Sequence, residues 1–189
     1  MTSALKILNK YWKHTSFRTP QKAIIEAVLN GENCIALLPT GGGKSICFQI
    51  PALMMEGVCI VVSPLIALMQ DQVNNLNERG IKAIALKSGL SQDDMIHLFD
   101  NLQFGNYQFL YLSPERLQSP FIQEKIKQLH INLIAIDEAH CISEWGHDFR
   151  PSYRHIKILK ELKPNVNLIA LTASATTNVL KDISDTLEL

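Results

Sequence analysis

Short apolar segments alternate with amphipathic segments along almost the whole chain, and this alternation limits the folds available to it. The apolar runs are rich in β-branched residues, as buried strands are, and occupy residues 34–38, 58–62, 83–86, 109–112, 133–136 and 168–171. Helical patterns fill the gaps, at residues 21–29, 65–77, 91–104, 153–162 and 176–187. Strands that alternate with helices form βαβ units, so we expect an α/β fold with a mostly parallel sheet and helices on both faces.

The polar residues that follow these strands are the candidates for function. In a parallel α/β sheet, ligands bind outside the carboxyl ends of the strands. The segments that begin there are residues 39–45, 63–64, 113–115, 137–140 and 172–176. They are rich in glycine, hydroxyl and carboxylate side chains, so we expect them to meet at one edge of the sheet.

Composition supports one globular domain and excludes few partners. The chain has 189 residues, of which 47% are hydrophobic and 19% charged, enough for a packed core. Lys and Arg number 18, as do Asp and Glu, so no global basic field indicates nucleic acid, although a local patch would suffice. The four cysteines form no C-x-x-C pair, which predicts free thiols in a reducing cytoplasm. No apolar run approaches 18 residues and the first ten residues lack an apolar core, so we expect neither a membrane span nor a secretory signal.

Residues 38–45 read Leu-Pro-Thr-Gly-Gly-Gly-Lys-Ser, directly after an apolar run. The glycines allow a tight turn that aims several N–H groups at one point, and a helix that opens at Ser45 would direct its positive end there. Lys44 adds a positive charge, and Ser45 offers a hydroxyl to Mg²⁺. A strict P-loop has Gly where Leu38 stands, but the phosphate-holding end is intact. The alternative is a Gly-rich turn that happens to carry a lysine.

Asp137 and Glu138 follow the apolar residues 133–136. Asp137 can hold Mg²⁺ opposite Ser45, and Glu138 can orient and deprotonate an attacking water. Alone, the pair could be a polar loop that serves solubility. With the Gly-Gly-Gly-Lys-Ser segment in the same parallel sheet, it indicates nucleotide hydrolysis. A zinc site at His140, Cys141 and His147 is disfavoured, because their spacing fits none of the usual ligand patterns.

The Asp-Glu-Ala-His sequence of residues 137–140, together with the glycine-rich loop, resembles superfamily 2 helicases of the DEAH type. Residues 141–151, Cys-Ile-Ser-Glu-Trp-Gly-His-Asp-Phe-Arg-Pro, closely resemble the aromatic-rich loop of RecQ DNA helicases. Further segments resemble that family in the family's own order, at residues 17–21, 61–72, 112–117 and 171–176. The resemblance covers nearly the whole chain and implies a RecA-like P-loop domain.

The resemblance also implies a role for individual residues. ATP would be bound by Arg18, Gln21, Thr40, Gly41, Gly42, Gly43, Lys44 and Ser45, with Gln21 on the adenine edge and Arg18 on its face. Glu138 would be the catalytic base and Lys44 would hold the β- and γ-phosphates; Ser45 and Asp137 would hold Mg²⁺. DNA contact and coupling would fall to Ser63, Gln72, Trp145, Phe149, Arg150, Thr172 and Thr176.

Several of these residues could instead have purely structural roles. Trp145 and Phe149 offer π-faces to unpaired bases with Arg150 and Arg154 nearby, but aromatic residues also pack in cores. Residues 63–64, Ser-Pro, suit a strand-ending turn equally well. Residues 19–20, Thr-Pro, suit a helix start with Pro at its first position, which could also carry the adenine contacts.

The chain departs from the RecQ pattern near its beginning and in its length. His14 replaces the usual adenine-stacking aromatic, with Trp12 as a possible substitute, Lys13 replaces a glycine, and Ser174 replaces a threonine. The family continues into a second RecA-like domain, a zinc-binding region and a winged helix. Residues 1–189 therefore correspond to the first RecA-like domain alone. The second domain would supply an arginine finger, which contributes roughly 10³- to 10⁵-fold in rate, so we expect the isolated chain to be inactive or very weak.

The resemblance implies a 3′-to-5′ DNA helicase that uses ATP and Mg²⁺ in repair and recombination. Its partners would be single-stranded and forked duplex DNA, and it would act as a monomer near the nucleoid of a bacterial-type cytoplasm. Two alternatives remain at this point. One is a P-loop ATPase that acts on RNA, although such enzymes lack the loop from Trp145 to Arg150. The other is a nonenzymatic binding module switched by nucleotide, although a switch needs no catalytic base such as Glu138.

Overall fold

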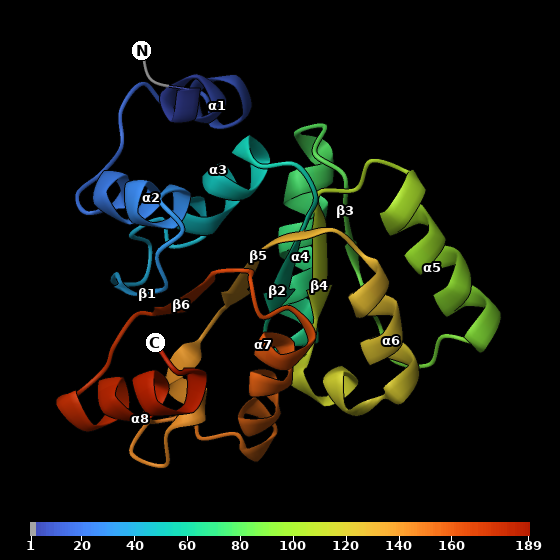
Figure 1. Ribbon diagram of the computed structural model, residues 1–189. Helices are drawn as coiled ribbons and strands as arrows, with labels where there is room; N and C mark the ends of the chain where they lie inside the picture. Colours follow the sequence, from blue (N-terminus) through green and yellow to red (C-terminus); the bar gives the residue numbers. More distant parts are fainter. Residues whose placement is uncertain (1–2) are drawn as a thin grey trace.

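Six parallel strands form one sheet within residues 3–189, which the computed structural model describes (Figure 1). Their order across the sheet is β1-β6-β5-β2-β4-β3. The strands are β1 (Cys34–Leu37), β2 (Val58–Val62), β3 (Ala83–Ala85), β4 (Phe109–Leu112), β5 (Ile131–Ile136) and β6 (Leu168–Thr172). Every paired neighbour runs parallel, so the carboxyl ends of all the strands share one edge.

Helices connect these strands and cover both faces of the sheet. The α-helices are α1 (Ser3–Trp12), α2 (Gln21–Leu29), α3 (Ile46–Met54), α4 (Ile66–Glu78), α5 (Gln92–Phe104), α6 (Pro120–Gln128), α7 (Ile158–Leu162) and α8 (Thr177–Leu187). The 3₁₀ helices are η1 (Pro114–Gln118), η2 (Ala139–Ile142) and η3 (Pro151–Lys157). Short loops join most of them, as is usual in α/β units.

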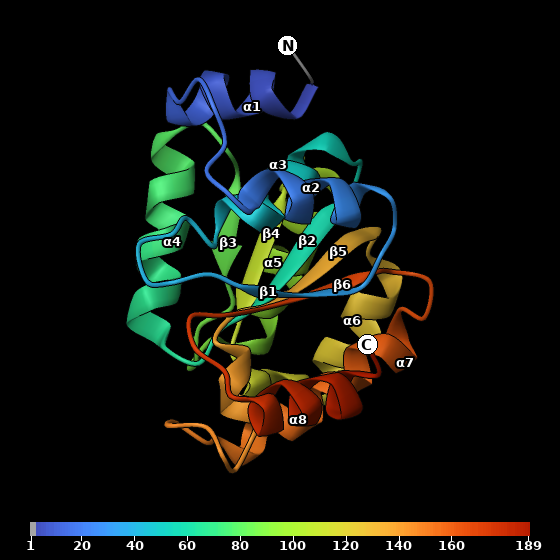
Figure 2. The ribbon, with the colours of Figure 1, turned by 90° about the vertical axis from the view of Figure 1, so that its left-hand side faces the viewer.

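The two faces of the sheet build separate cores. Along β2, Cys59 and Val61 point toward α2, α3 and α4, whereas Ile60 and Val62 point toward α5, α6, α7 and α8. Such strands are apolar on both sides because helices cover both faces. α1 packs on α2 and α3 through a third, smaller cluster that contains Leu8, Ile25 and Ile50. Figure 2 shows α1 across one end of the domain and α8 near the other.

The predicted fold class is confirmed, with local differences. β5 begins at Ile131, two residues before the predicted strand, and the predicted helix over 153–162 is divided into η3 and α7. Pro151 is the first residue of η3, a 3₁₀ helix with three residues per turn, and the α-helical geometry begins only at Ile158. Pro20 is the N-cap of α2 rather than its first helical residue. α1 and α6 lie outside the predicted ranges.

Two further observations concern the side chains and the helix lengths. All four cysteines are free, and three of them are buried. Among residues 3–189, no helix is both long enough and apolar enough to cross a bilayer.

Candidate nucleotide and nucleic-acid site

The loop between β1 and α3 has the backbone geometry of a phosphate cradle. Gly41 and Gly43 adopt positive φ values of 79° and 76°, which side chains with a Cβ rarely tolerate. A Cβ on Gly42 would lie 2.8 Å from the Pro39 carbonyl oxygen. α3 begins directly after this turn, at Ile46, so its free N–H groups and its dipole favour an anion. The loop thus requires its glycines for shape and not only for flexibility.

Arg18, just before α2, and Gln21, the first residue of α2, are held against this loop. Gln21 Nε2 donates to the Gly43 carbonyl oxygen at 3.2 Å, and Gln21 Oε1 accepts from the Arg18 backbone N–H at 2.8 Å. Arg18 Nη1 donates to the Gly41 carbonyl oxygen at 3.1 Å. A cavity of about 320 Å³ opens beside them, and it is lined by Leu8, Lys13, His14, Thr15, Ser16, Arg18, Gln21, Gly43 and Ile46. His14 and Lys13, the two unusual residues, therefore lie in this cavity wall.

The acid pair leaves the end of β5, which lies between β6 and β2 in the sheet. The Asp137 N–H donates to the Val62 carbonyl oxygen at 2.9 Å, and the Tyr153 hydroxyl donates to the Asp137 carbonyl oxygen at 2.9 Å. The Asp137 side chain is buried, and burial together with the neighbouring Glu138 charge raises its pKa to about 6, against the opposing effect of Lys44. A cation at this carboxylate would relieve that penalty.

Lys44 and Glu138 meet across the edge of the sheet. Lys44 Nζ lies 3.6 Å from Glu138 Oε1, and both side chains are largely shielded from solvent. Glu138 has a left-handed backbone with φ of 49°, unusual for a residue with a side chain. This turn ends β5 and directs the second carboxylate toward the glycine-rich loop. The structure therefore brings together the two residues that the sequence predicted as catalytic.

His140 links the acid pair to the end of β6. Its Nδ1 lies 2.9 Å from Thr172 Oγ1 and 3.4 Å from Glu138 Oε2, and its ring stacks on His147 with centroids 4.2 Å apart. Burial is the main cause that lowers the His140 pKa, so the neutral ring prevails at neutral pH. Among residues 3–189, no group of three His, Cys, Asp or Glu side chains is arranged to hold a metal ion.

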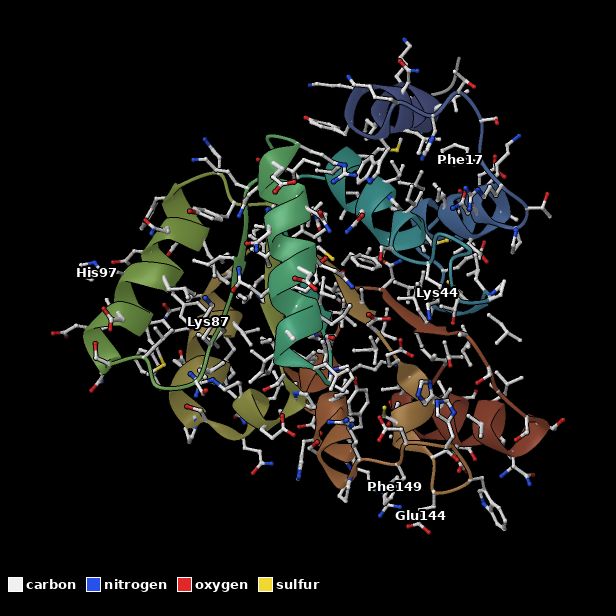
Figure 3. The ribbon with its side chains drawn as sticks, turned by 180° about the vertical axis from the view of Figure 1, so that it is seen from behind. Phe17, Lys44, Lys87, His97, Glu144 and Phe149 are labelled. Atoms are coloured by element: carbon white, nitrogen blue, oxygen red, sulfur yellow. The ribbon has the colours of Figure 1, made fainter. Side chains whose placement is uncertain are left out.

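The loop after η2 carries the candidate DNA-contacting side chains. Trp145 is 72% exposed, so it is not packed in the core. Arg150 Nε pairs with Asp148 Oδ2 at 3.2 Å, and Arg150 Nη1 donates to the Pro64 carbonyl oxygen at 3.4 Å. Arg154 stacks on the Phe149 ring, with its Cζ 5.1 Å from the centroid. In Figure 3 Lys44 lies between Phe17 and Phe149, so the loop and the N-terminal segment flank the phosphate cradle.

The comparisons with known proteins agree with this geometry. The family model described as DEAD/DEAH box helicase matches residues 18–183, most of the chain. The chain belongs to the DEAD/DEAH box helicase family. It is 48% identical over 190 aligned residues to the probable ATP-dependent DNA helicase RecS of Bacillus subtilis, covering 100% of this chain and 38% of that protein. It is 47% identical to the ATP-dependent DNA helicase RecQ of the same organism, covering 98% of this chain and 32% of the relative.

The fold of this helicase domain also matches solved structures. The crystal structure of the DUF1998 helicase MrfA bound to DNA and AMPPNP superposes with a TM-score of 0.76 at 21% identity, covering 99% of this chain and 28% of the other. At that identity the likeness concerns the fold. The homology to RecQ-family DNA helicases rests instead on the sequence matches along the whole chain.

The residues of the helicase domain that were predicted to contact DNA or to couple it to the nucleotide differ in their exposure to solvent. Trp145 is exposed, and Phe149 and Arg150 are half-buried at the surface loop. Ser63 is 1% exposed and its Oγ has no partner among the described residues, whereas Thr172 is fully buried against His140. Gln72 accepts a hydrogen bond from the Tyr111 hydroxyl at 2.9 Å. Thr176 caps α8 by accepting from the Val179 N–H at 3.4 Å. Trp145 and Thr176 are thus exposed and Gln72 is half-buried like Phe149 and Arg150, whereas Ser63 and Thr172 are buried.

Two contributors to the site were missed from the sequence. Tyr153 anchors the backbone of Asp137, and His140 joins Glu138 to Thr172. Polar side chains in apolar surroundings are the only sequence signal, and that signal does not name a partner. His140 stands inside the motif, but it was weighed only as a zinc ligand.

Proposed function

We propose that this helicase domain is the first ATP-binding motor domain of a 3′-to-5′ DNA helicase that separates strands in repair and recombination. The observation that carries the proposal is the meeting of Lys44 and Glu138, 3.6 Å apart, at the edge where β1 and β5 end. A phosphate cradle on one side and a candidate base on the other are what nucleotide hydrolysis needs. The RecS and RecQ relatives, of which the chain spans 38% and 32%, are named as ATP-dependent DNA helicases.

The residues divide the work as follows. When ATP binds, Lys44 exchanges its pairing with Glu138 for the β- and γ-phosphates, and the glycine turn supplies backbone N–H groups. Glu138, released from Lys44, orients a water and accepts its proton. Thr40 and the three glycines shape the cradle, while Arg18 and Gln21 meet the adenine beside the 320 Å³ cavity. For adenine to contact the Gln21 amide, that amide must give up a bond to Arg18 or to the loop.

A magnesium ion fits the donor set. The Asp137 carboxylate is buried, so a neighbouring cation would favour its charged form. Ser45 is the N-cap of α3, the helix that follows the cradle, and its hydroxyl is the second oxygen ligand. Magnesium is commonly held by one or two such oxygen ligands together with phosphate oxygens and water. It would neutralise charge on the phosphates during transfer. Asp137 and Ser45 are the residues we assign to hold it.

The partner we propose is DNA, as single strands and forked duplexes, contacted by a monomer in the cytoplasm. Trp145 supports this because an exposed indole offers a stacking surface to an unpaired base. Ser63, Gln72, Thr172 and Thr176 would act behind that surface, linking it to the nucleotide site.

A titration tests the proposal. A fluorescent ATP analogue with Mg²⁺ should bind the chain, and Lys44→Ala should abolish the binding while leaving the thermal unfolding transition in place. Phosphate release is measured in parallel with single-stranded DNA, with RNA of the same length and with neither. Stimulation by RNA and not by DNA, or binding that survives Lys44→Ala, would contradict the proposal.

A further inference from the structure

A line of hydrogen bonds joins three elements next to the site. Gln49 of α3 donates from Nε2 to the Tyr111 hydroxyl at 3.3 Å, and that hydroxyl donates to Gln72 Oε1 of α4 at 2.9 Å. Tyr111 lies in β4 and is fully buried, and Gln49 is 5% exposed. Buried polar groups persist where their hydrogen bonds are satisfied, and the Tyr111 hydroxyl is satisfied as both acceptor and donor.

The far end of this line reaches the acid pair. The Gln72 side chain lies beside the Asp137 carboxylate, where its amide acts to lower the Asp137 pKa against the larger effect of burial. Because Tyr111 occupies the oxygen of the Gln72 amide, the nitrogen is the end left to face Asp137, and it can only donate. Burial holds the pKa of Tyr111 well above its usual range, so its hydroxyl keeps the proton that fixes this orientation.

The near end reaches the other expected magnesium ligand. The Gln49 N–H donates to the Ser45 carbonyl oxygen at 2.9 Å, in the first turn of α3. Ser45, Gln49 and Gln72 line one cavity of about 200 Å³, together with Trp12, Asn75, Leu76 and Arg79. The hydrogen-bonded line therefore runs from the helix that follows Ser45 to Gln72, whose side chain lies beside the Asp137 carboxylate.

We propose that Tyr111 and Gln72 are positioning residues that orient the Asp137 carboxylate for the magnesium ion of the nucleotide site. The inference rests on the proposed function, since it assumes that Asp137 holds that ion. It also gives Gln72 a task inside the domain in place of contact with DNA. Hydrogen bonds that support a metal ligand typically change metal affinity 10- to 100-fold when they are removed, so the line has a measurable effect.

The test measures how much magnesium the nucleotide site requires. The unaltered 189-residue chain, Tyr111→Phe and Gln72→Met are titrated with a fluorescent ATP analogue at a series of free Mg²⁺ concentrations. Each substitution nearly keeps the volume: Tyr111→Phe removes the hydroxyl that contacts both Gln49 and Gln72, and Gln72→Met removes the amide beside Asp137. We expect the half-saturating Mg²⁺ concentration to rise about tenfold in each variant, with analogue affinity restored at high Mg²⁺. The double variant should require no more Mg²⁺ than either single variant, because both substitutions would act on Asp137 through the Gln72 amide.

A matched control separates this effect from a general loss of packing. Gln123 of α6 is another half-buried glutamine, whose Nε2 donates to the Leu117 carbonyl oxygen at 2.7 Å on the other face of the sheet. Gln123→Met should lower stability without changing the Mg²⁺ requirement. Thermal unfolding of every variant is recorded, and Gln72→Met decides the question if Tyr111→Phe does not fold.

Three results would overturn the inference or its basis. An unchanged Mg²⁺ requirement in Gln72→Met means that the line is structural only. A fall in single-stranded DNA affinity with an unchanged Mg²⁺ requirement would assign Gln72 to DNA contact. Absence of Mg²⁺-dependent analogue binding by the unaltered chain would contradict the proposed function itself and not the positioning alone.

Discussion

The charges of the Lys44 and Glu138 side chains in the proposed site neutralise each other. Lys44 and Glu138 are each other's partners, with Nζ and Oε1 3.6 Å apart. Asp137 is the exception, because its carboxylate is buried and its pKa is raised to about 6. A carboxylate kept at a cost to stability is typical of functional sites.

Replacing Asp137 by Asn should stabilise the chain at neutral pH. The folded state raises the Asp137 pKa from 3.8 to about 6, so the folded state holds the proton more tightly than the unfolded state. The stability of the unaltered chain therefore falls as pH rises from about 4 to about 6, because the buried carboxylate becomes charged. Asp137→Asn removes that loss and should gain about 1–3 kcal/mol at pH 7 and little at pH 4. Thermal unfolding across this pH range, without metal, measures it; an equal gain at both pH values would contradict the cause.

Trp145 should carry a measurable share of the affinity for single-stranded DNA. Loss of a base-stacking aromatic costs about 1–3 kcal/mol, so Trp145→Ala should weaken binding of a short unpaired strand by that amount. Phe104, at the end of α5, is 76% exposed and provides the matched control, since it is an exposed aromatic residue away from the loop. Fluorescence anisotropy with a labelled oligonucleotide compares Trp145→Ala with Phe104→Ala. Equal losses would mean that exposure and not position determines binding.

Among the elements, strands were easier to predict than their ends and connections. Periodicity located all six strands because each is apolar and bounded by turn residues. It failed at residues 151–162, where η3 and α7 share one apolar face although their periods differ. The sequence predicted that Lys44 and Glu138 lie at the same edge, because both follow strands of a parallel sheet and the carboxyl ends of such strands share one edge. It could not predict that Ser63 is buried or that Gln72 turns toward Tyr111, because those facts depend on packing between distant elements.

The N-cap residues of two helices allow a test of whether Thr176 couples DNA binding to nucleotide binding or only stabilises the fold. Ser91 caps α5 in a reciprocal capping box with Asp94, and Thr176 caps α8. Ser91→Ala and Thr176→Ala should each lower the unfolding free energy by about 1 kcal/mol. Only Thr176→Ala should change how single-stranded DNA affects nucleotide binding, because α8 follows the end of β6 beside the site and α5 does not. Thr176→Ser keeps the hydroxyl and should restore both properties; a coupling change in Ser91→Ala would argue against this separation.

At the scale of the whole molecule, the described residues that we assign to the nucleotide site lie along one edge of the sheet. The cradle, Glu138 and the 320 Å³ cavity all belong to one sheet edge and the segment before α2. The chain spans 38% and 32% of the RecS and RecQ relatives, so we propose that the other wall of the cleft belongs to the remainder of a longer helicase.

The 189-residue chain tested alone should therefore bind ATP weakly, hydrolyse it very slowly and not unwind DNA. An arginine finger contributes roughly 10³- to 10⁵-fold in rate, and we expect a deficit of that order relative to a two-domain helicase of the family. Phosphate release and strand displacement on a forked duplex measure the two activities. DNA-stimulated release at the rate of such a helicase would show that the chain builds a complete catalytic site by itself or by self-association.

The two tryptophans lie in the two regions where we propose that nucleotide and DNA bind. Trp12 lines a cavity with Ser45, under the guanidinium of Arg79, whereas Trp145 stands 72% exposed on the loop after η2. No other tryptophan occurs in the chain. The protein consequently carries two intrinsic fluorophores in different surroundings, one beside the proposed nucleotide site and one on the loop proposed to contact DNA. Trp12→Phe and Trp145→Phe would each leave a single emitter, so the order of the two binding events could be timed by stopped flow without any attached dye.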